Sequence, residues 1–350
     1  MRLIATSLLA VALVTTSALA QPAPQTPPPA QASGPDAAAD FAADPLNTSA
    51  TYAFIMDGDN GLPLYSKRGD ELMVPASMSK LMLYYIVFTR IKEGRLKMDT
   101  EFTVSEHAWR TGGAGTDGST MFLPVNAHVT VDDLLHGAII VSGNDACITL
   151  AEGIAGSEEN YAREATAKAK ELGIDATFGN ASGLDNPNER MSAHAIATLA
   201  YKIIHEFPEY YPIFSQTSFT YNKITQPNRN PLLKELPGSD GVKTGHLEVS
   251  GYGLVGSAVQ DGKRRIIVLQ GLASETERKK EGPRVMRSAF ADFKTAKLVD
   301  KGAQVATAPV WLGEEKAVPL VATQDASAGL HISSLKSVKS QVVFKTPLYA

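Results

Sequence analysis

The sequence predicts an α+β fold in which a mostly antiparallel sheet packs against a cluster of helices. Short β-type runs stand before a long helical stretch, and further strands and a last helix follow that stretch. This order is typical of a sheet whose strands come from both ends of a domain, with the helices segregated between them. After residue 301 the pattern changes to short β segments separated by turns, which predicts a second, small β domain.

The N-terminus carries the three-part pattern of a secretory signal peptide. Met1-Arg2 is a positive start, residues 3–19 form an uncharged apolar run, and Ala18-Leu19-Ala20 is a small-x-small cleavage site. A membrane-spanning helix is the alternative, but the run is barely long enough and no positive flank follows it. We therefore expect a signal peptide over 1–20, cleavage after it, and export of the protein.

Composition sets further limits. Residues 21–45 are rich in Pro, Ala and Gln, which is typical of a stiff, solvated linker rather than a core. Hydrophobic content of 44% and charged content of 20% are ordinary for a globular protein. A net charge of −4 gives no reason to expect a nucleic-acid partner. Cys147 is the only cysteine and lies in an apolar run, so we expect a buried thiol and no intramolecular disulfide.

The first half of the main domain is expected to contain a hairpin and then helices. Residues 51–56 and 62–65 are β-type runs around a Gly- and Asp-containing turn. Residues 75–92 predict a helix that is apolar nearly all round and therefore buried. The Gly-rich segment 111–120 lacks the features of a phosphate cradle, and we expect a mobile surface loop. Further helices are predicted over 131–140, 145–153, 158–172 and 191–207.

The second half returns to strands. Residues 250–258 and 264–272 alternate or run apolar around a tight turn, which predicts a second hairpin. A helix is expected over 278–298. The small β domain that follows is predicted to use strands at 305–310, 317–321, 329–332 and 337–344.

A serine and a lysine stand one helical turn apart in Ser77-Met78-Ser79-Lys80. Positions i and i+3 share a face of a helix, so the two side chains can touch. Free N–H groups at the helix N-terminus also favour developing negative charge. A serine hydroxyl is a weak nucleophile that needs a base, and a buried lysine near other cations has its pKa lowered enough to serve. Ser77 is therefore the candidate nucleophile and Lys80 its candidate base.

Two further motifs follow in order, Ser142-Gly143-Asn144 and Lys243-Thr244-Gly245. Ser-x-x-Lys alone is weak evidence, because average residue usage yields it about once in a chain of this length. It also occurs here a second time, at Ser333–Lys336. Lys-Thr-Gly is rarer, expected in about one such chain in ten. Here it leads into an apolar strand, where glycine lets a substrate backbone approach the edge.

Together the three motifs resemble those of the penicillin-recognising serine enzymes, the DD-peptidases and serine β-lactamases. The segments around them are similar to the low-molecular-mass D-alanyl-D-alanine carboxypeptidases of peptidase family S11. These segments are Pro75–Met82, Ser142–Cys147, Asn180–Asp185, Gln226–Asn230 and Gly241–His246. The resemblance implies a serine transpeptidase/β-lactamase-like catalytic domain over 46–298 and a small β domain over 299–350.

The resemblance also implies a role for each motif residue. Ser77 would attack the penultimate D-alanine carbonyl of a peptidoglycan stem peptide that ends in D-Ala-D-Ala, with Lys80 as its base. Ser142 would pass a proton to the leaving D-alanine nitrogen, while Asn144 would hold Lys80 and the substrate amide. Lys243 would supply positive potential. β-Lactam antibiotics would acylate the same serine, and no metal or organic cofactor is implied.

A second group of residues is implied to bind the substrate. Thr244 would help bind the terminal carboxylate, and Gly245 would leave room for the substrate along the strand. Backbone N–H groups of the nucleophile and of His246 would form the oxyanion hole. In these carboxypeptidases an arginine beyond the Lys-Thr-Gly strand also contacts the carboxylate. Arg278 stands at the matching place, with Arg284 as the alternative.

Two features depart from the family's usual pattern. Leu247 replaces a common Thr and Ser250 a common Ala, which bears on substrate fit and deacylation rather than on the nucleophile. The family also usually ends in a complete β domain and an amphipathic membrane-binding helix. No apolar-faced basic helix is present before Ala350, so we expect either a truncated β domain or an enzyme without that membrane contact. The expected location is the periplasm, with membrane association left open.

Several alternatives were weighed against an exported D-Ala-D-Ala carboxypeptidase. A class A β-lactamase needs a Glu-x-x-x-Asn loop that activates the deacylating water, and the middle region has none. A DD-endopeptidase that cuts crosslinks is a smaller variation on the same fold. A catalytically inactive wall-binding protein belongs to another class, and it would not need all the motif side chains. The histidines form no His-Glu-x-x-His pair, so a metal site is not predicted.

Overall fold

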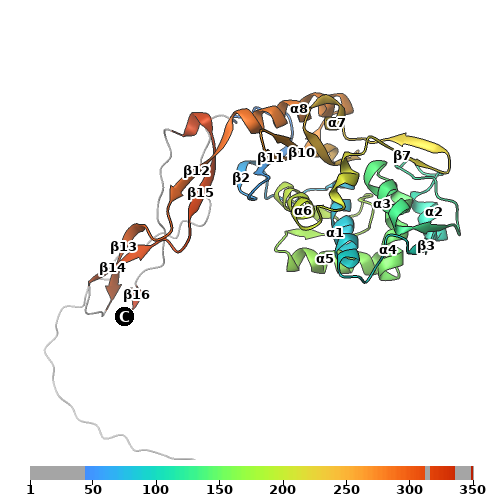
Figure 1. Cartoon of the computed structure of the whole chain (residues 1–350), viewed down its shortest axis with the longest axis horizontal. Helices are drawn as coiled ribbons and strands as arrows, with labels where there is room; N and C mark the ends of the chain where they lie inside the picture. The colour runs from blue at the N-terminus through green and yellow to red at the C-terminus, as the bar shows by residue number, and fades with distance from the viewer. Residues whose placement is uncertain (1–43, 312–315, 336–347, 350) are drawn as a thin grey trace, which may run out of the picture. The chain divides into compact units, whose positions relative to one another are not determined.

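A computed structural model of the chain describes residues 44–311, 316–335 and 348–349. The expected signal peptide, and the linker as far as residue 43, lie outside these described residues. Figure 1 shows how the helices and strands are arranged. Within the described ranges, no helix is long and apolar enough to cross a membrane. The same ranges contain no cluster of three or more His, Cys, Asp or Glu side chains that could hold a metal ion.

A five-stranded antiparallel sheet forms the centre of the main domain. Its strand order is β2-β1-β11-β10-β9, so strands from the two ends of the domain pair with each other. The strands are β1 Tyr52–Asp57, β2 Pro63–Lys67, β9 Ser239–Leu247, β10 Gly251–Gln260 and β11 Lys263–Leu272. The predicted fold class and both predicted hairpins are confirmed.

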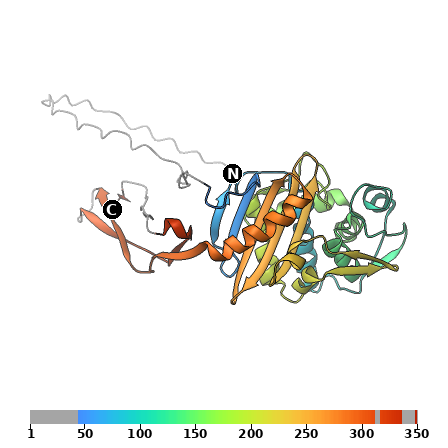
Figure 2. The same ribbon diagram turned by 90° about the horizontal axis from the view of Figure 1, so that it is seen from above.

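The two faces of this sheet carry separate layers of core. Successive side chains of a strand point to opposite faces, so Phe54 and Val268 pack with the helical cluster while Ile55 and Ile267 face the other way. Helix α8, Glu275–Ala291, covers that other face (Figure 2). Burial on both sides explains why β10 and β11 are nearly continuous apolar runs.

Six of the helices between β2 and β9 in the chain form the helical cluster. They are α1 Lys80–Lys92, α2 Glu106–Gly112, α3 Val131–Ile140, α4 Asn144–Ala155, α5 Glu158–Glu171 and α6 Ala193–Glu206. Residues 80–88 of α1 are all buried, as predicted for a helix inside the domain. Side chains of Ser105, Thr130, Ser157 and Ser192 cap helices of the cluster by accepting a backbone N–H. Helix α2 was not predicted.

Short elements connect the larger ones. They are η1 Ala76–Ser79, β3 Glu101–Thr103, β4 His128–Thr130, β5 Ala176–Thr177, β6 Arg190–Met191, η2 Tyr211–Ser215, β7 Ser218–Tyr221, β8 Ile224–Pro227 and α7 Leu232–Glu235. The helix predicted over 75–92 therefore begins as a 3₁₀ turn, η1, before α1. The α-helical geometry of α1 begins only at Lys80.

The C-terminal β segment begins earlier than expected. Its elements are β12 Phe293–Val299, β13 Gln304–Trp311, β14 Ala317–Val321, β15 Ala326–His331, η3 Ile332–Ser334 and β16 Leu348–Tyr349. The prediction of a helix as far as residue 298 is wrong, because α8 ends at Ala291 and β12 pairs with β15. Phe293 is buried and its ring packs edge-on against Tyr65 at 5.7 Å, a tertiary contact that no local pattern reveals. The strand predicted over 337–344 lies outside the described residues.

Candidate active site

The turn η1 and the start of α1 bring the candidate nucleophile and base together. In a 3₁₀ turn the residues at i and i+3 eclipse each other, so Lys80 lies directly over Ser77. The Nζ atom of Lys80 donates to Ser77 Oγ at 2.7 Å. Ser77 is half-buried, whereas Lys80 is fully buried. The nucleophile can therefore be reached from outside while its base is shielded from water.

Burial lowers the pKa of Lys80 to about 8. Desolvation is the main cause, because it disfavours the charged ammonium, and the positive charge of Arg229 acts in the same direction. The amine also donates to Asn144 Oδ1 at 2.8 Å and to Ser142 Oγ at 3.4 Å. A lysine with this pKa is partly free base near neutral pH, so it can accept the proton of a serine hydroxyl.

Ser142 joins the first lysine to a second. Lys243 Nζ donates to Ser142 Oγ at 2.8 Å and to Thr244 O at 3.0 Å. Burial, followed by the charge of Lys80, holds the pKa of Lys243 well below its usual value. An unbroken set of polar contacts therefore runs from Ser77 through Lys80 and Ser142 to Lys243. The five predicted catalytic side chains meet at one place, although 101 residues separate Ser142 from Lys243.

Two residues of this site have a left-handed backbone. Ala76, which precedes the nucleophile, has φ of 51°, and Ser142 has φ of 64°. Such a conformation costs a non-glycine residue on the order of 1–2 kcal/mol, and it persists only where the surrounding structure holds it. Ala76 and Ser142 are two of the nine described non-glycine residues with positive φ, and both lie where Ser77 and Ser142 approach the same lysine.

The Lys-Thr-Gly motif lies within β9, the last strand in the sheet order. A Cβ atom added at Gly245 would lie 3.1 Å from Pro75 O and 3.2 Å from the Ala76 side chain. Glycine at this position therefore lets the turn before the nucleophile approach the strand closely. Thr244 is nearly buried, while the exposed ring of His246 stacks on Tyr252 at 3.9 Å. The oxyanion and carboxylate roles of these residues stay predictions.

Arg278 reaches the same strand from α8. It is buried, its Nη1 lies 3.4 Å from Gly245 O, and its guanidinium lies 5.5 Å from the centre of the Tyr252 ring. Arg284, the alternative carboxylate ligand, is instead engaged by Glu281 at 2.8 Å. The structure thus brings Arg278, rather than Arg284, to the Lys-Thr-Gly strand.

Hydrogen bonds hold the end of the Gly-rich segment 111–120, whereas residues 114, 115, 117 and 118 within it are exposed; the mobility of this surface loop stays a prediction. The buried carboxylate of Asp145 accepts from Thr120 Oγ1 at 2.7 Å and from the backbone N–H groups of Met121 and Leu123 at 2.8 and 3.0 Å. Asn144 N donates to Ser119 O at 2.7 Å. From the sequence, Asp145 is expected at the start of a helix and within the family-like segment Ser142–Cys147. Its long-range partners are invisible without the tertiary structure.

Residues missed by the sequence analysis also lie at the site. Ser77 Oγ donates to the backbone carbonyl of Ser182 at 3.3 Å, so the segment around Ser182 borders the nucleophile. The charge of Arg229 acts on Lys80, Lys243 and Arg278 alike. Both segments were noted only as similar to the family. In the sequence, the first segment could have been found by its run Asn-Ala-Ser-Gly-Leu-Asp. The second could have been found by its single cation, Arg229, in a stretch rich in Asn and Pro.

Cys147 is not part of the nucleophilic chemistry. It is fully buried on α4, and burial raises the pKa of its thiol to about 11. The thiol therefore stays protonated near neutral pH, and the prediction of a buried cysteine is confirmed.

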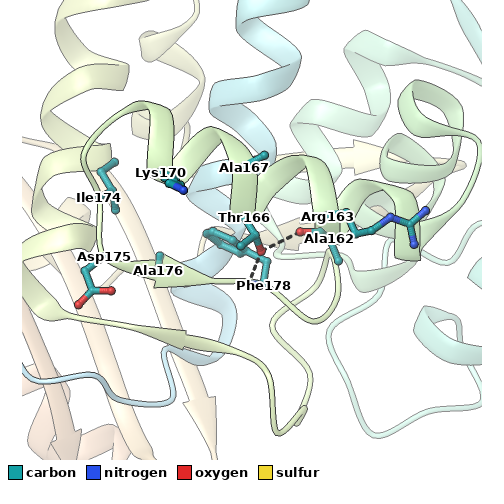
Figure 3. A pocket seen from close by; sticks show the side chains of 9 residues that line it. All are labelled: Ala162, Arg163, Thr166, Ala167, Lys170, Ile174, Asp175, Ala176 and Phe178. Atoms are coloured by element: carbon teal, nitrogen blue, oxygen red, sulfur yellow. Dashed lines mark hydrogen bonds between the residues drawn. The ribbon is translucent and has the colours of Figure 1, made fainter. Parts of the chain in front are cut away.

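A pocket of about 590 Å³ lies away from these residues, against α5 and β5 (Figure 3). Its lining consists of Ala162, Arg163, Thr166, Ala167, Lys170, Ile174, Asp175, Ala176 and Phe178. The hydroxyl of Thr166 donates to Ala162 O and accepts from Phe178 N, so it is already satisfied by the fold. No lining residue belongs to the set around Ser77, and the hollow is separate from the chemistry.

The site combines a buried lysine of lowered pKa in contact with a serine, a second serine that joins this lysine to another, and a strand edge flanked by cations. These are the groups that a serine-type acyl-transfer enzyme requires. Comparison with known proteins gives the family. Residues 39–273 match the D-alanyl-D-alanine carboxypeptidase family S11, and residues 293–350 match the C-terminal domain of penicillin-binding protein 5. The chain therefore belongs to the S11 D-alanyl-D-alanine carboxypeptidases, and it is a serine-type D-Ala-D-Ala carboxypeptidase with the penicillin-binding protein fold.

Three relatives illustrate the similarity. D-alanyl-D-alanine carboxypeptidase DacC of Escherichia coli is 38% identical over 296 residues, which cover 84% of this chain and 74% of that protein. The structure of penicillin-binding protein 5 from Haemophilus influenzae is 35% identical, with a TM-score of 0.69 over 86% of this chain and 88% of that one. Penicillin-binding protein D2 from Listeria monocytogenes, in its ampicillin-bound form, is 28% identical with a TM-score of 0.59, covering 69% and 97%.

Proposed function

We propose that Ser77 removes the terminal D-alanine from peptidoglycan stem pentapeptides through a covalent acyl-enzyme, and that penicillins acylate the same serine. The observation that carries this proposal is the 2.7 Å contact between Ser77 Oγ and the fully buried amine of Lys80, whose pKa is lowered to about 8. A base is in place, and it is available near neutral pH. The ampicillin-bound relative supports the second part of the proposal.

Acylation follows from these contacts. Lys80 takes the proton from Ser77 as the Oγ–carbon bond forms at the penultimate D-alanine carbonyl. Lys243 donates to Ser142 Oγ at 2.8 Å, which leaves the Ser142 hydrogen free to point towards the leaving nitrogen. As the carbon–nitrogen bond breaks, Ser142 protonates the free D-alanine and regains a proton from Lys80. Water then hydrolyses the ester, with Lys80 accepting its proton and Ser77 recovering its own.

Cations on one side of the site favour a substrate that ends in a carboxylate. Lys243 and Arg278 are nearly buried, and their charges, together with that of Arg229, act on one another at the Lys-Thr-Gly strand. Positive charges that are close together and shielded from water create a positive electrostatic potential, which a terminal D-alanine carboxylate would neutralise. Thr244 adds a hydroxyl beside them. The same groups suit the carboxylate that penicillins carry.

We also propose that the enzyme works after export, in the periplasm. The support is the three-part pattern at residues 1–20, together with a substrate class that exists only in the cell wall. Whether the protein is also held at a membrane surface forms no part of this proposal.

The first test is intact-mass spectrometry of the mature protein incubated with benzylpenicillin, followed by peptide mapping. We expect one adduct, on the peptide that contains Ser77, and release of free D-alanine from a pentapeptide substrate. Ser77→Ala should abolish both. Ser333→Ala, in the chain's other Ser-x-x-Lys sequence, is the matched control and should behave like the unchanged enzyme. An adduct that persists in Ser77→Ala would defeat the assignment, and penicillin consumed without any adduct would favour a β-lactamase.

A further inference from the structure

A short loop beside the nucleophile is attached to a buried carboxylate. We call residues 179–184 the Ser182 loop. Glu189 is only 1% exposed, and its Oε2 accepts the backbone N–H of Gly179 at 2.7 Å and that of Asn180 at 3.4 Å. Both donors are backbone amides rather than cationic side chains. One carboxylate thus holds the first turn of the loop.

A second carboxylate holds the middle of the same loop. Glu158, at the start of α5, is 9% exposed and accepts the backbone N–H of Ala181 through Oε1 at 2.8 Å. Its other oxygen, Oε2, lies 2.9 Å from His107 Nε2 on α2. Glu158 therefore ties the Ser182 loop to two helices of the cluster.

The rest of the Ser182 loop is held by hydrogen bonds to the side chain of Asn180, a residue of the loop itself. Asn180 Oδ1 accepts the backbone N–H groups of Ser182 at 3.0 Å and Gly183 at 2.7 Å, and Asn180 Nδ2 donates to Leu184 O at 2.8 Å. Three consecutive residues of the loop are therefore fixed to one side chain. A displacement of residues 179–181 would carry Ser182 with it.

The loop meets the nucleophile at two points. Ser77 Oγ donates to Ser182 O at 3.3 Å. Gly183 has φ of +70°, and a Cβ atom there would lie 2.2 Å from Ala76 O, so the loop backbone rests directly on the turn that carries the nucleophile. Because Lys80 donates to the same Ser77 oxygen at 2.7 Å, the hydroxyl is oriented between the lysine amine and the Ser182 carbonyl.

We propose that Glu189 and Glu158 are positioning residues, which hold the Ser182 loop against Ser77 and so fix the position of Ser77 Oγ beside Lys80. This inference rests on the proposed role of Ser77. A carboxylate buried among neutral donors is costly to keep. Charge-assisted hydrogen bonds from the loop amides offset only part of that cost for Glu189, because burial still raises the pKa of its carboxyl group. Such a local cost is expected where the geometry of a functional site depends on it.

The test compares Glu189→Ala with Glu189→Gln in the full mature protein. The alanine variant removes the oxygen that accepts both loop N–H groups, whereas the glutamine amide oxygen can still accept from Gly179 and Asn180. We expect Glu189→Ala to slow benzylpenicillin acylation by about tenfold or more, because near-attack geometry is lost, and Glu189→Gln to stay within about threefold of the unchanged enzyme. Hydrogen exchange of the peptide that contains the Ser182 loop should rise only in the alanine variant.

Glu164→Ala is the matched control, because Glu164 also lies on α5 and accepts twice from Arg90 at 2.7 Å but does not bond the loop. It should lower the melting temperature without slowing acylation. Glu158→Ala, which removes a single loop contact, replaces Glu189→Ala if that variant does not fold, and it should slow acylation in the same direction.

Three results would overturn the inference. They are acylation of Glu189→Ala at the rate of the unchanged enzyme, equal slowing by Glu189→Gln and Glu189→Ala, or equal slowing by Glu164→Ala. A failure of the proposed function is recognised separately, because the unchanged enzyme would then form no adduct. The exchange measurement would still report whether the two carboxylates hold the loop.

Discussion

At the scale of single residues, the candidate base Lys80 depends on both its position in the sequence and its burial in the fold. Its position three residues after Ser77 makes contact possible, but contact alone does not make a base. Complete burial makes Lys80 suitable as a base, because desolvation lowers its pKa to about 8. Its amine is also held in place by Asn144 Oδ1. The sequence analysis anticipated a buried lysine near other cations. It did not identify Arg229 as one of those cations.

The pH dependence of acylation should report this lysine. Acylation needs the free base of Lys80, and below its pKa that fraction falls about tenfold per pH unit. The rate constant for acylation by benzylpenicillin should therefore rise with pH up to about 8 and level off above it. Quenched-flow mass spectrometry between about pH 5.5 and 9.5 measures it, with circular dichroism at each pH as a check on folding. A flat profile below pH 8 would argue against Lys80 as the base.

At the scale of elements, the site depends on how closely three backbone segments approach. The turn η1 lies between β9 on one side and the Ser182 loop on the other. Both neighbours contribute a glycine at the point of contact, Gly245 from the strand and Gly183 from the loop, and in each case the atoms nearest to an added Cβ belong to residues 75–76. A side chain at either position would push the nucleophile out of place.

A matched pair of glycine substitutions separates this packing effect from backbone strain. Gly183 and Gly173 have φ of +70° and +68°, but an added Cβ meets Ala76 O at 2.2 Å only at Gly183 and nothing within 4 Å at Gly173. Gly173→Ala should lower the free energy of unfolding by about 1 kcal/mol and leave acylation unchanged. Gly183→Ala should cost about 2 kcal/mol or more and slow acylation about tenfold. Urea unfolding and penicillin acylation measure the two effects, and equal behaviour of the variants would contradict this account.

At the scale of the whole molecule, strands from the two ends of the main domain form one sheet with core on both faces. The C-terminal β segment is attached to this sheet through β2 and β1, where Phe293 packs on Tyr65 and Thr295 Oγ1 donates to Asp57 Oδ2 at 3.2 Å. Asp57 is also paired with Arg265 at 3.1 Å in a nearly buried position. These contacts lie on β1, β2 and β11, whereas the Lys-Thr-Gly motif lies on β9 at the opposite side of the sheet.

Export is the prediction that belongs to the whole chain. When the full sequence is expressed in a bacterium with a periplasm, the mature protein should begin at Gln21 and fractionate with periplasmic proteins. Ala20→Arg places a large charged residue at the cleavage site and should leave the precursor uncut. N-terminal mass analysis of each fraction gives the result. A mature form that keeps residues 1–20 would refute the predicted signal peptide.

Local patterns along the chain were enough to predict most of the helices and strands and the chemical groups of the candidate site. Apolar periodicity was enough to predict both hairpins of the main sheet and most helices of the main domain, because those patterns are local. Motif spacing sufficed for the pairing of Ser77 with Lys80, which depends only on helical geometry. The end of α8 was misjudged, since the strand after it is stabilised by the distant contact of Phe293 with Tyr65.

The arrangement of those groups around one another depends on contacts between segments that are far apart in the chain. Ser142 meets Lys243 across 101 residues, and Glu158 and Glu189 meet backbone amides of a loop that carries no periodic signal. The lowered pKa of Lys80 likewise arises from burial beneath several helices and strands. Contacts between segments far apart in the chain depend on packing, and packing is a property of the folded whole. The candidate nucleophile could therefore be proposed from the sequence, but the contacts that surround it could not.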